Sequence, residues 1–128
     1  MRANEKFVLG LLSVAALSAL PGCIVAAAAV GAGTAAYVSG DLEDRIEAPP
    51  ARVVQAAERS LKKKDVTVVS SDATGIDGKL IARTALDKKI EITVKREGET
   101  GSRIAIRVDT FGDEDLSRQI LAGIRDEL

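Results

Sequence analysis

Three stretches in the second half of the chain have an apolar side chain at nearly every second position, so that these side chains share one face of the stretch. Such a period of two is typical of strands that bury one face and expose the other. The positions that share the buried face are Leu80, Ala82 and Thr84 in the first stretch, Ile90, Ile92 and Val94 in the second, and Ile104, Ile106 and Val108 in the third. The short connections 86–88 and 98–101 predict antiparallel hairpins.

Two other segments repeat their apolar residues with the period of a helix. Pro49-Pro50 opens the first, which we expect over 50–64 because proline suits the first turn of a helix. The second begins at Asp113, whose carboxylate is a good helix cap. The expected apolar faces are Val53, Val54, Ala57 and Leu61 in the first helix, and Leu116, Ile120, Leu121, Ile124 and Leu128 in the second.

Two further strands complete the predicted fold. One is expected over 38–47, where Asp44 interrupts the apolar spacing, and one at the β-branched run 66–69, followed by a loop over 72–78. The order β-α-β-β-β-β-α predicts an α+β two-layer sandwich, with two helices on one face of an antiparallel sheet of about five strands. We expect this globular domain to occupy residues 40–128.

A segment of different character ends at the only cysteine. A short basic stretch precedes the apolar run 7–20, which is shorter than the ~20 residues that span a bilayer. The run ends in Leu20-Pro21-Gly22-Cys23, the pattern that a lipoprotein signal peptidase recognises. We therefore expect residues 1–22 to be a signal peptide. Cys23 would become the first residue and carry diacylglycerol and an N-acyl lipid such as palmitate.

Residues 23–39 are almost uncharged, so that 7–38 taken together resembles one long membrane segment. Pro21-Gly22 breaks that segment and favours a cleaved lipoprotein over an uncleaved signal anchor or a soluble protein with a buried N-terminal helix. Small residues four apart within 26–36 suit self-association or contact with a membrane partner, and a plain apolar tether is the alternative. Because Ile24 rather than aspartate follows the cysteine, we expect the outer membrane more than the inner membrane.

Composition and charge narrow the classes of function. The 128 residues carry a formal net charge of −1, which argues against nucleic-acid binding, since nucleic-acid binders present strongly basic surfaces. The chain has no histidine, so that the commonest catalytic base and transition-metal ligand is missing. Its aromatic content of 2% leaves few side chains for stacking against a ligand. We expect no enzymatic activity, no metal and no cofactor other than the lipid on Cys23.

Three short motifs have a chemical interpretation, but a structural one explains each better. Ser60-Leu61-Lys62-Lys63 matches the S-x-x-K of serine acyl enzymes without their companion motifs. Asp109 and the acidic run 113–115 suggest a divalent cation, but they lack the glycine and the alternating ligands of a calcium loop, and helix capping explains them. Gly75-Ile76-Asp77-Gly78 opens a strand, whereas phosphate loops open helices, so we interpret it as a turn.

The polar face of the sheet is the candidate partner surface. It is expected to carry four basic residues, Arg83, Lys95, Arg103 and Arg107. These side chains suit an acidic partner, lipid head groups or an anionic glycan. Glu91 and Asp109 fall on the same face, and cross-strand ion pairs exposed to solvent are the alternative.

Several of these stretches together resemble one family. They are the Ala/Gly run 31–38, Gly40-Asp41-Leu42-Glu43, Ala48-Pro49, the strand 78–84, and above all the stretch 106–118. Over most of 20–128 the chain resembles the small bacterial lipoproteins catalogued as domain of unknown function 3568. The resemblance implies an envelope lipoprotein with a compact α+β domain and no assigned activity. It also implies structural roles for Tyr37 and Phe111 as aromatic anchors and for Gly112, and surface contacts for Arg83 and Arg107.

The sequence therefore predicts a location better than a reaction. We expect a lipid-anchored envelope protein whose domain faces the periplasm and binds or scaffolds another envelope component, or a copy of itself through residues 26–36. The alternatives are a small envelope hydrolase and a self-associating structural lipoprotein.

Overall fold

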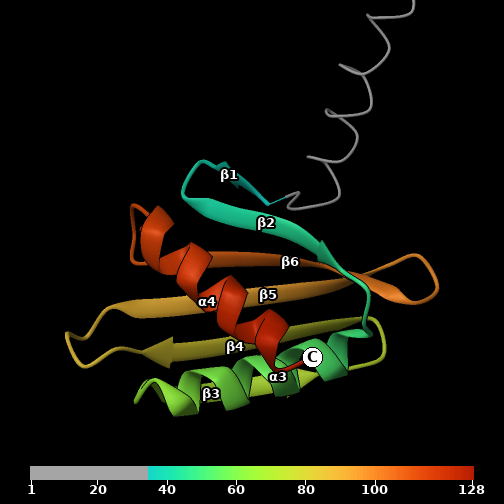
Figure 1. The fold of residues 1–128 in the computed structure, drawn as a ribbon, viewed down its shortest axis with the longest axis horizontal. Helices are drawn as coiled ribbons and strands as arrows, with labels where there is room; N and C mark the ends of the chain where they lie inside the picture. The colour runs from blue at the N-terminus through green and yellow to red at the C-terminus, as the bar shows by residue number, and fades with distance from the viewer. Residues whose placement is uncertain (1–34) are drawn as a thin grey trace, which may run out of the picture. The chain divides into compact units, whose positions relative to one another are not determined.

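A six-stranded antiparallel sheet with two helices on one of its faces makes up residues 35–128, the part of the chain that the computed structural model describes (Figure 1). The elements are β1 (Ala36–Val38), β2 (Asp41–Ile46), α3 (Pro50–Lys63), β3 (Thr67–Ala73), β4 (Asp77–Arg83), β5 (Lys89–Glu97), β6 (Gly101–Val108) and α4 (Glu114–Asp126). Their order across the sheet is β1-β2-β6-β5-β4-β3. The α+β sandwich is confirmed, with six strands where about five were expected. The predictions for residues 1–34, including Cys23, lie outside the described residues.

Both helices begin where the sequence predicts, for different physical reasons. Pro49 is extended and Pro50 occupies the first turn of α3, where its missing N–H costs nothing. At α4, the Asp113 carboxylate accepts a hydrogen bond from the backbone N–H of Leu116 at 3.1 Å. This bond satisfies one of the free donors of the first turn.

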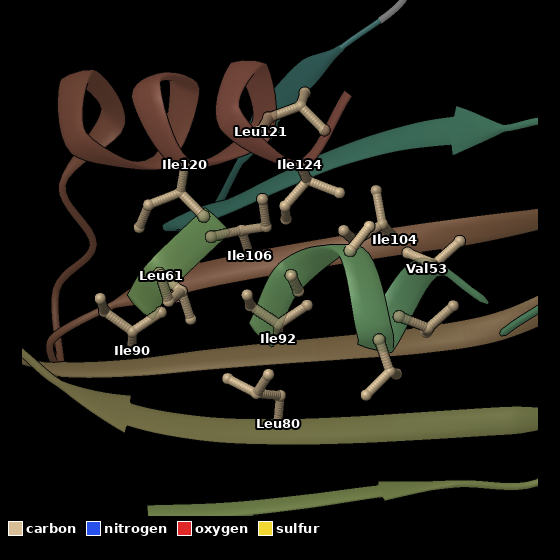
Figure 2. Packing of buried hydrophobic residues seen from close by; sticks show 14 of the residues in the cluster. Val53, Leu61, Leu80, Ile90, Ile92, Ile104, Ile106, Ile120, Leu121 and Ile124 are labelled. Atoms are coloured by element: carbon tan, nitrogen blue, oxygen red, sulfur yellow. The ribbon is translucent and has the colours of Figure 1, made fainter. Parts of the chain in front are cut away.

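The core lies between the helices and the inner face of the sheet. Figure 2 shows Val53 and Leu61 of α3 and Ile120 and Ile124 of α4 directed toward the isoleucines of β5 and β6. The predicted inward positions of the three alternating strands are fully buried, namely Leu80, Ala82, Ile90, Ile92, Val94, Ile104, Ile106 and Val108. Two predicted members do not belong to these elements, because Thr84 follows the end of β4 and Leu128 follows α4 and is exposed.

The strand expected over 38–47 is a hairpin instead. The chain reverses between β1 and β2 at Ser39 and Gly40, which have φ angles of 52° and 90°. Glycine adopts this left-handed conformation at no steric cost. The sequence did not predict β1, because β1 follows an uncharged run of small residues in which apolar and polar residues do not alternate.

The loop expected over 72–78 is also shorter than predicted. β3 continues to Ala73 and β4 begins at Asp77. Gly78 is a buried strand residue rather than a turn residue, and a Cβ there would lie 2.6 Å from Cγ2 of Val54 in α3. The glycine therefore lets the helix pack closely on the sheet.

Asp44, the residue that interrupts the apolar spacing of β2, is buried between Leu42 and Ile46 on the inner face, with 3% of its surface exposed. Its carboxylate forms an ion pair with Arg125 of α4 and accepts the backbone N–H of Arg45 at 2.7 Å. The interruption is therefore the point where α4 is held to β2 by charge, since a buried carboxylate needs partners of this kind.

β3 forms one edge of the sheet and is irregular. Val68 pairs with Ala82 and Ser70 with Ile81, so that Val69 between them is the extra residue of a β-bulge and is 59% exposed. A bulge bends the strand and interrupts its hydrogen-bonding ladder. At the opposite edge, β1 has three residues.

Ser117 supplies a first prediction. Its hydroxyl is fully buried in α4 and has no hydrogen-bond partner among residues 35–128. Ser117→Ala should leave the free energy of unfolding unchanged or raise it by up to about 1 kcal/mol, because an unpaired buried hydroxyl is removed and alanine favours helix. Urea unfolding measures this.

The matched control for Ser117→Ala is Ser102→Ala. The Ser102 hydroxyl is equally buried but donates to the carbonyl of Ala48 at 2.6 Å. Its removal should lower the free energy of unfolding by about 1–3 kcal/mol. A comparable loss in Ser117→Ala would show that the Ser117 hydroxyl has a partner.

Candidate functional site

The four predicted basic residues lie on the outer face of the sheet, away from the helices. Lys95 and Arg103 are direct neighbours across β5 and β6. Arg107 is next to Asp41 on one side and Glu91 on the other, and Arg83 is next to Lys89. The structure therefore brings Lys95 and Arg103 together. It places Arg83 and Arg107 near the other end of these strands, where β4 and β6 end.

Each of the three predicted arginines has an acidic partner. Arg103 Nε lies 2.8 Å from Oε2 of Glu97, Arg83 Nη1 lies 3.3 Å from Oδ1 of Asp87, and Arg107 Nε lies 2.7 Å from Oδ1 of Asp41. The partners differ from the expected Glu91 and Asp109. Glu91 lies instead within 3.7 Å of the Lys79 ammonium and 3.4 Å of the Lys89 ammonium. Lys95 forms no ion pair with any residue of 35–128.

Arg107 is a clamp between two loops rather than a simple surface charge. Besides Asp41, it donates from Nη2 to the carbonyl of Ser39 at 2.8 Å and from Nη1 to the carbonyl of Thr110 at 3.1 Å. The hydrogen bond to Asp41 raises the pKa of Arg107 above its ordinary value. One guanidinium thus joins the β1–β2 turn to the β6–α4 connection, and its planar fork of donors suits this task.

Gly40 and Gly112 bring the same two loops into backbone contact. Gly112 has a φ of 86°, and a Cβ there would lie 2.6 Å from Cα of Gly40 and also collide with the Tyr37 hydroxyl. The residues that carried the family resemblance, from Tyr37 to Gly40 and from Arg107 to Gly112, therefore meet at one corner. No signal in the sequence indicated this contact, because Gly40 and Gly112 are 72 positions apart in the chain.

We define the loop end of the domain as the β1–β2 turn, the β4–β5 turn and the β6–α4 connection. The last two are linked by the hydrogen bond from the Asp109 N–H to the Lys89 carbonyl at 2.8 Å and by the 3.4 Å contact of Lys88 with Asp113. Large apolar side chains are exposed here, with Leu86 at 83% and Phe111 at 93%. Of the two expected aromatic anchors, Tyr37 packs against the core and Phe111 does not.

A groove opens beside the loop end, between the end of α3, the start of α4 and the β4–β5 turn. Its volume is about 410 Å³, within the range of small-molecule sites. The apolar lining residues are Leu61, Val66, Ala85, Leu86, Ile90, Leu116 and Ile120. Lys64, Asp65 and Lys88 are the charged residues of the lining. Sequence reasoning missed this groove, because its walls come from three separate segments.

The other candidate motifs have structural surroundings. Ser60 lies against Gly123 of α4, while the Lys63 ammonium contacts Glu127, whose pKa is lowered chiefly by that hydrogen bond. The serine and the lysine of the S-x-x-K motif thus both make helix–helix contacts. Of the motif 75–78, predicted to be a turn, only Gly75 and Ile76 lie in the connection between β3 and β4, which is closed by Thr74, whose hydroxyl lies 2.8 Å from the Asp77 carboxylate.

The acidic run at the start of α4 consists of a cap and an ion pair. The hydrogen bond from the Leu116 N–H, followed by the contact with Lys88, lowers the pKa of Asp113 below its usual value. Glu114 pairs with Arg118 at 2.8 Å, one turn further along α4. Within residues 35–128, no group of three acidic, cysteine or histidine side chains is placed to hold a metal ion. No helix of this region has the length and apolar character needed to cross a membrane.

The clamp gives a second prediction. Arg107→Lys should lower the melting temperature, because the donors of an ammonium all lie on one nitrogen and cannot reach the three acceptors that the guanidinium contacts from three separate nitrogens. Arg83→Lys is the matched control, since its partner Asp87 is exposed, and it should change stability by less than about 0.5 kcal/mol. Thermal unfolding of both variants measures the difference, and equal losses would contradict the clamp.

Comparison with known proteins identifies the family. No curated protein matches the chain. One family model, described as "Protein of unknown function (DUF3568)", matches residues 6–127. The match includes the whole described domain through α4 and also the segment that ends at Cys23. The chain therefore belongs to the family of unknown function DUF3568.

Proposed function

We propose that the protein is a lipid-anchored envelope protein whose domain binds or scaffolds another envelope component from the periplasmic side. The observation that carries the proposal is Leu20-Pro21-Gly22-Cys23, a cysteine preceded by a small residue at the end of an apolar run. In this proposal the chain is cut before Cys23, which then carries the acyl chains. Two or more such chains anchor a protein stably, whereas a single chain does not.

The short distance along the chain between anchor and domain supports a role at the membrane. Ala35, where the described domain begins, is twelve positions after Cys23 in the chain. A chain of this length spans at most about 43 Å. Anchoring would therefore hold the domain close to the bilayer, which raises its effective concentration toward partners there.

Binding rather than catalysis is favoured by the surface of the domain. Large apolar side chains lie exposed at the loop end, where Leu86 and Phe111 are more than four-fifths accessible, and the groove lies next to them. Exposed apolar side chains beside a concave surface are a common feature of interaction sites. The two residues from the motifs with a chemical interpretation, Ser60 and Asp113, are engaged in helix packing and in helix capping.

The experiment that tests the proposal is mass spectrometry of the mature protein from cells fed a fatty-acid analogue. The expected N-terminus is Cys23 with two or three labelled acyl chains. Separation of the two membranes then tests the outer-membrane location. An intact Met1 without label would overturn the proposal.

A further inference from the structure

The groove beside the loop end exists because the two helices meet at one place and diverge from it. They touch where Gly123 of α4 lies against Ser60 of α3, and Lys64 Nζ still reaches the carbonyl of Gln119 at 3.0 Å. α3 ends at Lys63, while α4 begins at Glu114, more than a turn before Gln119. The two helices diverge toward the end of α3 and the start of α4, as Figure 1 shows.

The floor and walls of the groove are apolar and reach the core. Leu61, Ile90 and Ile120 form part of the lining and are buried to 1% or less exposure. Leu116 lines it from α4, and Leu86 lines it from the β4–β5 turn with 83% of its surface exposed. A ligand that fills this space removes apolar surface from water on three sides, which is the main source of affinity for an alkyl chain.

The charges at the groove determine which amphiphile fits it. Its lining contains two lysines, Lys64 and Lys88, and one carboxylate, Asp65, and a second carboxylate, Asp113, contacts Lys88 from outside the lining. Lys64 is held over the groove by its hydrogen bond to Gln119, and Lys88 is held by its 3.4 Å contact with Asp113. Both ammonium groups keep free donor positions, since an ammonium has three. These donors suit an anionic group at the end of an alkyl chain.

We infer that the groove binds the acyl chain of an anionic single-chain amphiphile, with the chain between α3, α4 and the β4–β5 turn and its head group at Lys64 and Lys88. The chemistry is shared by a free fatty acid and an anionic lysophospholipid. The inference goes beyond the proposed function and does not depend on acylation of Cys23, because the lining residues all lie within 61–120.

The test is photocrosslinking of the full chain, reconstituted in phosphatidylcholine vesicles, with a hexadecanoate that carries a diazirine near its methyl end. Mass spectrometry locates the adducts. We expect them on the β4–β5 turn and on the first two turns of α4. The same pattern is expected with Cys23→Ala, which separates this inference from the lipid anchor. Adducts confined to other segments would overturn the inferred amphiphile site. The groove would then be better explained as a site for an apolar side chain of a protein partner.

Two matched pairs of variants test the chain site and the head-group site separately. Leu86→Glu should reduce adducts in the groove at least about tenfold, while Ile76→Glu, an exposed apolar residue of the β3–β4 turn, should not change them. Lys64→Glu combined with Lys88→Glu should weaken competition by dodecanoate about tenfold without altering competition by dodecanol. Lys79→Glu is the control, because Lys79 is an exposed residue of β4 that does not line the groove. Circular dichroism confirms that each variant is folded.

The competitors identify the source of the amphiphile. Displacement of the probe by dodecanoate but not by lysophosphatidylglycerol supports a free fatty acid, and the reverse supports a lysophospholipid. Equal displacement by dodecanol and dodecanoate would overturn the assignment of an anionic head group. Unchanged adducts in Leu86→Glu would overturn the chain site.

Discussion

Gly112→Ala is expected to lower the free energy of unfolding by about 2–4 kcal/mol. Two effects combine, because alanine is strained at the φ of 86° and its Cβ would lie 2.6–2.7 Å from the backbone of Gly40. The β1–β2 turn would have to move away from the β6–α4 connection, so that the clamp of Arg107 would also be lost. Urea unfolding followed by circular dichroism measures the loss.

Gly75→Ala is the matched control for Gly112→Ala. No atom lies within 4 Å of a Cβ at Gly75, and its φ is not positive. The substitution should leave stability unchanged or raise it by up to about 1 kcal/mol, since alanine restricts the unfolded chain. Tyr37→Phe, added to Gly112→Ala, should restore little stability, because the collision with Gly40 remains. Equal stabilities of the two alanine variants would show that the contact between Gly40 and Gly112 can adjust to a Cβ at position 112.

Cys23→Ala is expected to abolish acyl labelling completely and to leave an uncut precursor. The proposed modification needs the thiol, because the diacylglyceryl group is attached through sulfur and the peptidase acts on the modified residue. Labelled fatty acid followed by gel electrophoresis measures both effects, since the uncut chain is longer by the 22 residues of the predicted signal peptide.

Ile24→Ala is the matched control for Cys23→Ala, because it changes the neighbouring residue and keeps the thiol. It should be labelled and cut like the native chain. Ile24→Asp should also be labelled, but should move toward the inner membrane if the sorting expectation is right. Labelling of Cys23→Ala equal to that of the native chain would contradict the lipid anchor.

The elements that sequence reasoning predicted well are those whose signal is local. Alternation in β4, β5 and β6 depends on residues two apart, and the starts of both helices depend on a proline pair and a capping aspartate. In each case the residues that give the sequence signal lie within the element that they predict or directly before it.

The features that sequence reasoning missed depend on distant residues. Asp44 is acceptable on a buried face because of Arg125, which lies 81 residues further on. The end of β3 is polar because it lies at the edge of the sheet, where neither face is deeply buried. Asp41 is the partner of Arg107 because β2 pairs with β6. The groove likewise has walls from three segments, which no single stretch of sequence indicates.

The bulge at Val69 has a consequence for crowded copies of the protein. An open sheet edge can accept a strand from another molecule, and anchoring in a plane would make encounters between edges frequent. The break in the ladder of β3 removes a straight run of donors and acceptors, and β1 at the other edge offers three residues. Neighbouring domains would therefore meet without merging into a continuous intermolecular sheet, which keeps a dense layer of them free of amyloid-like growth.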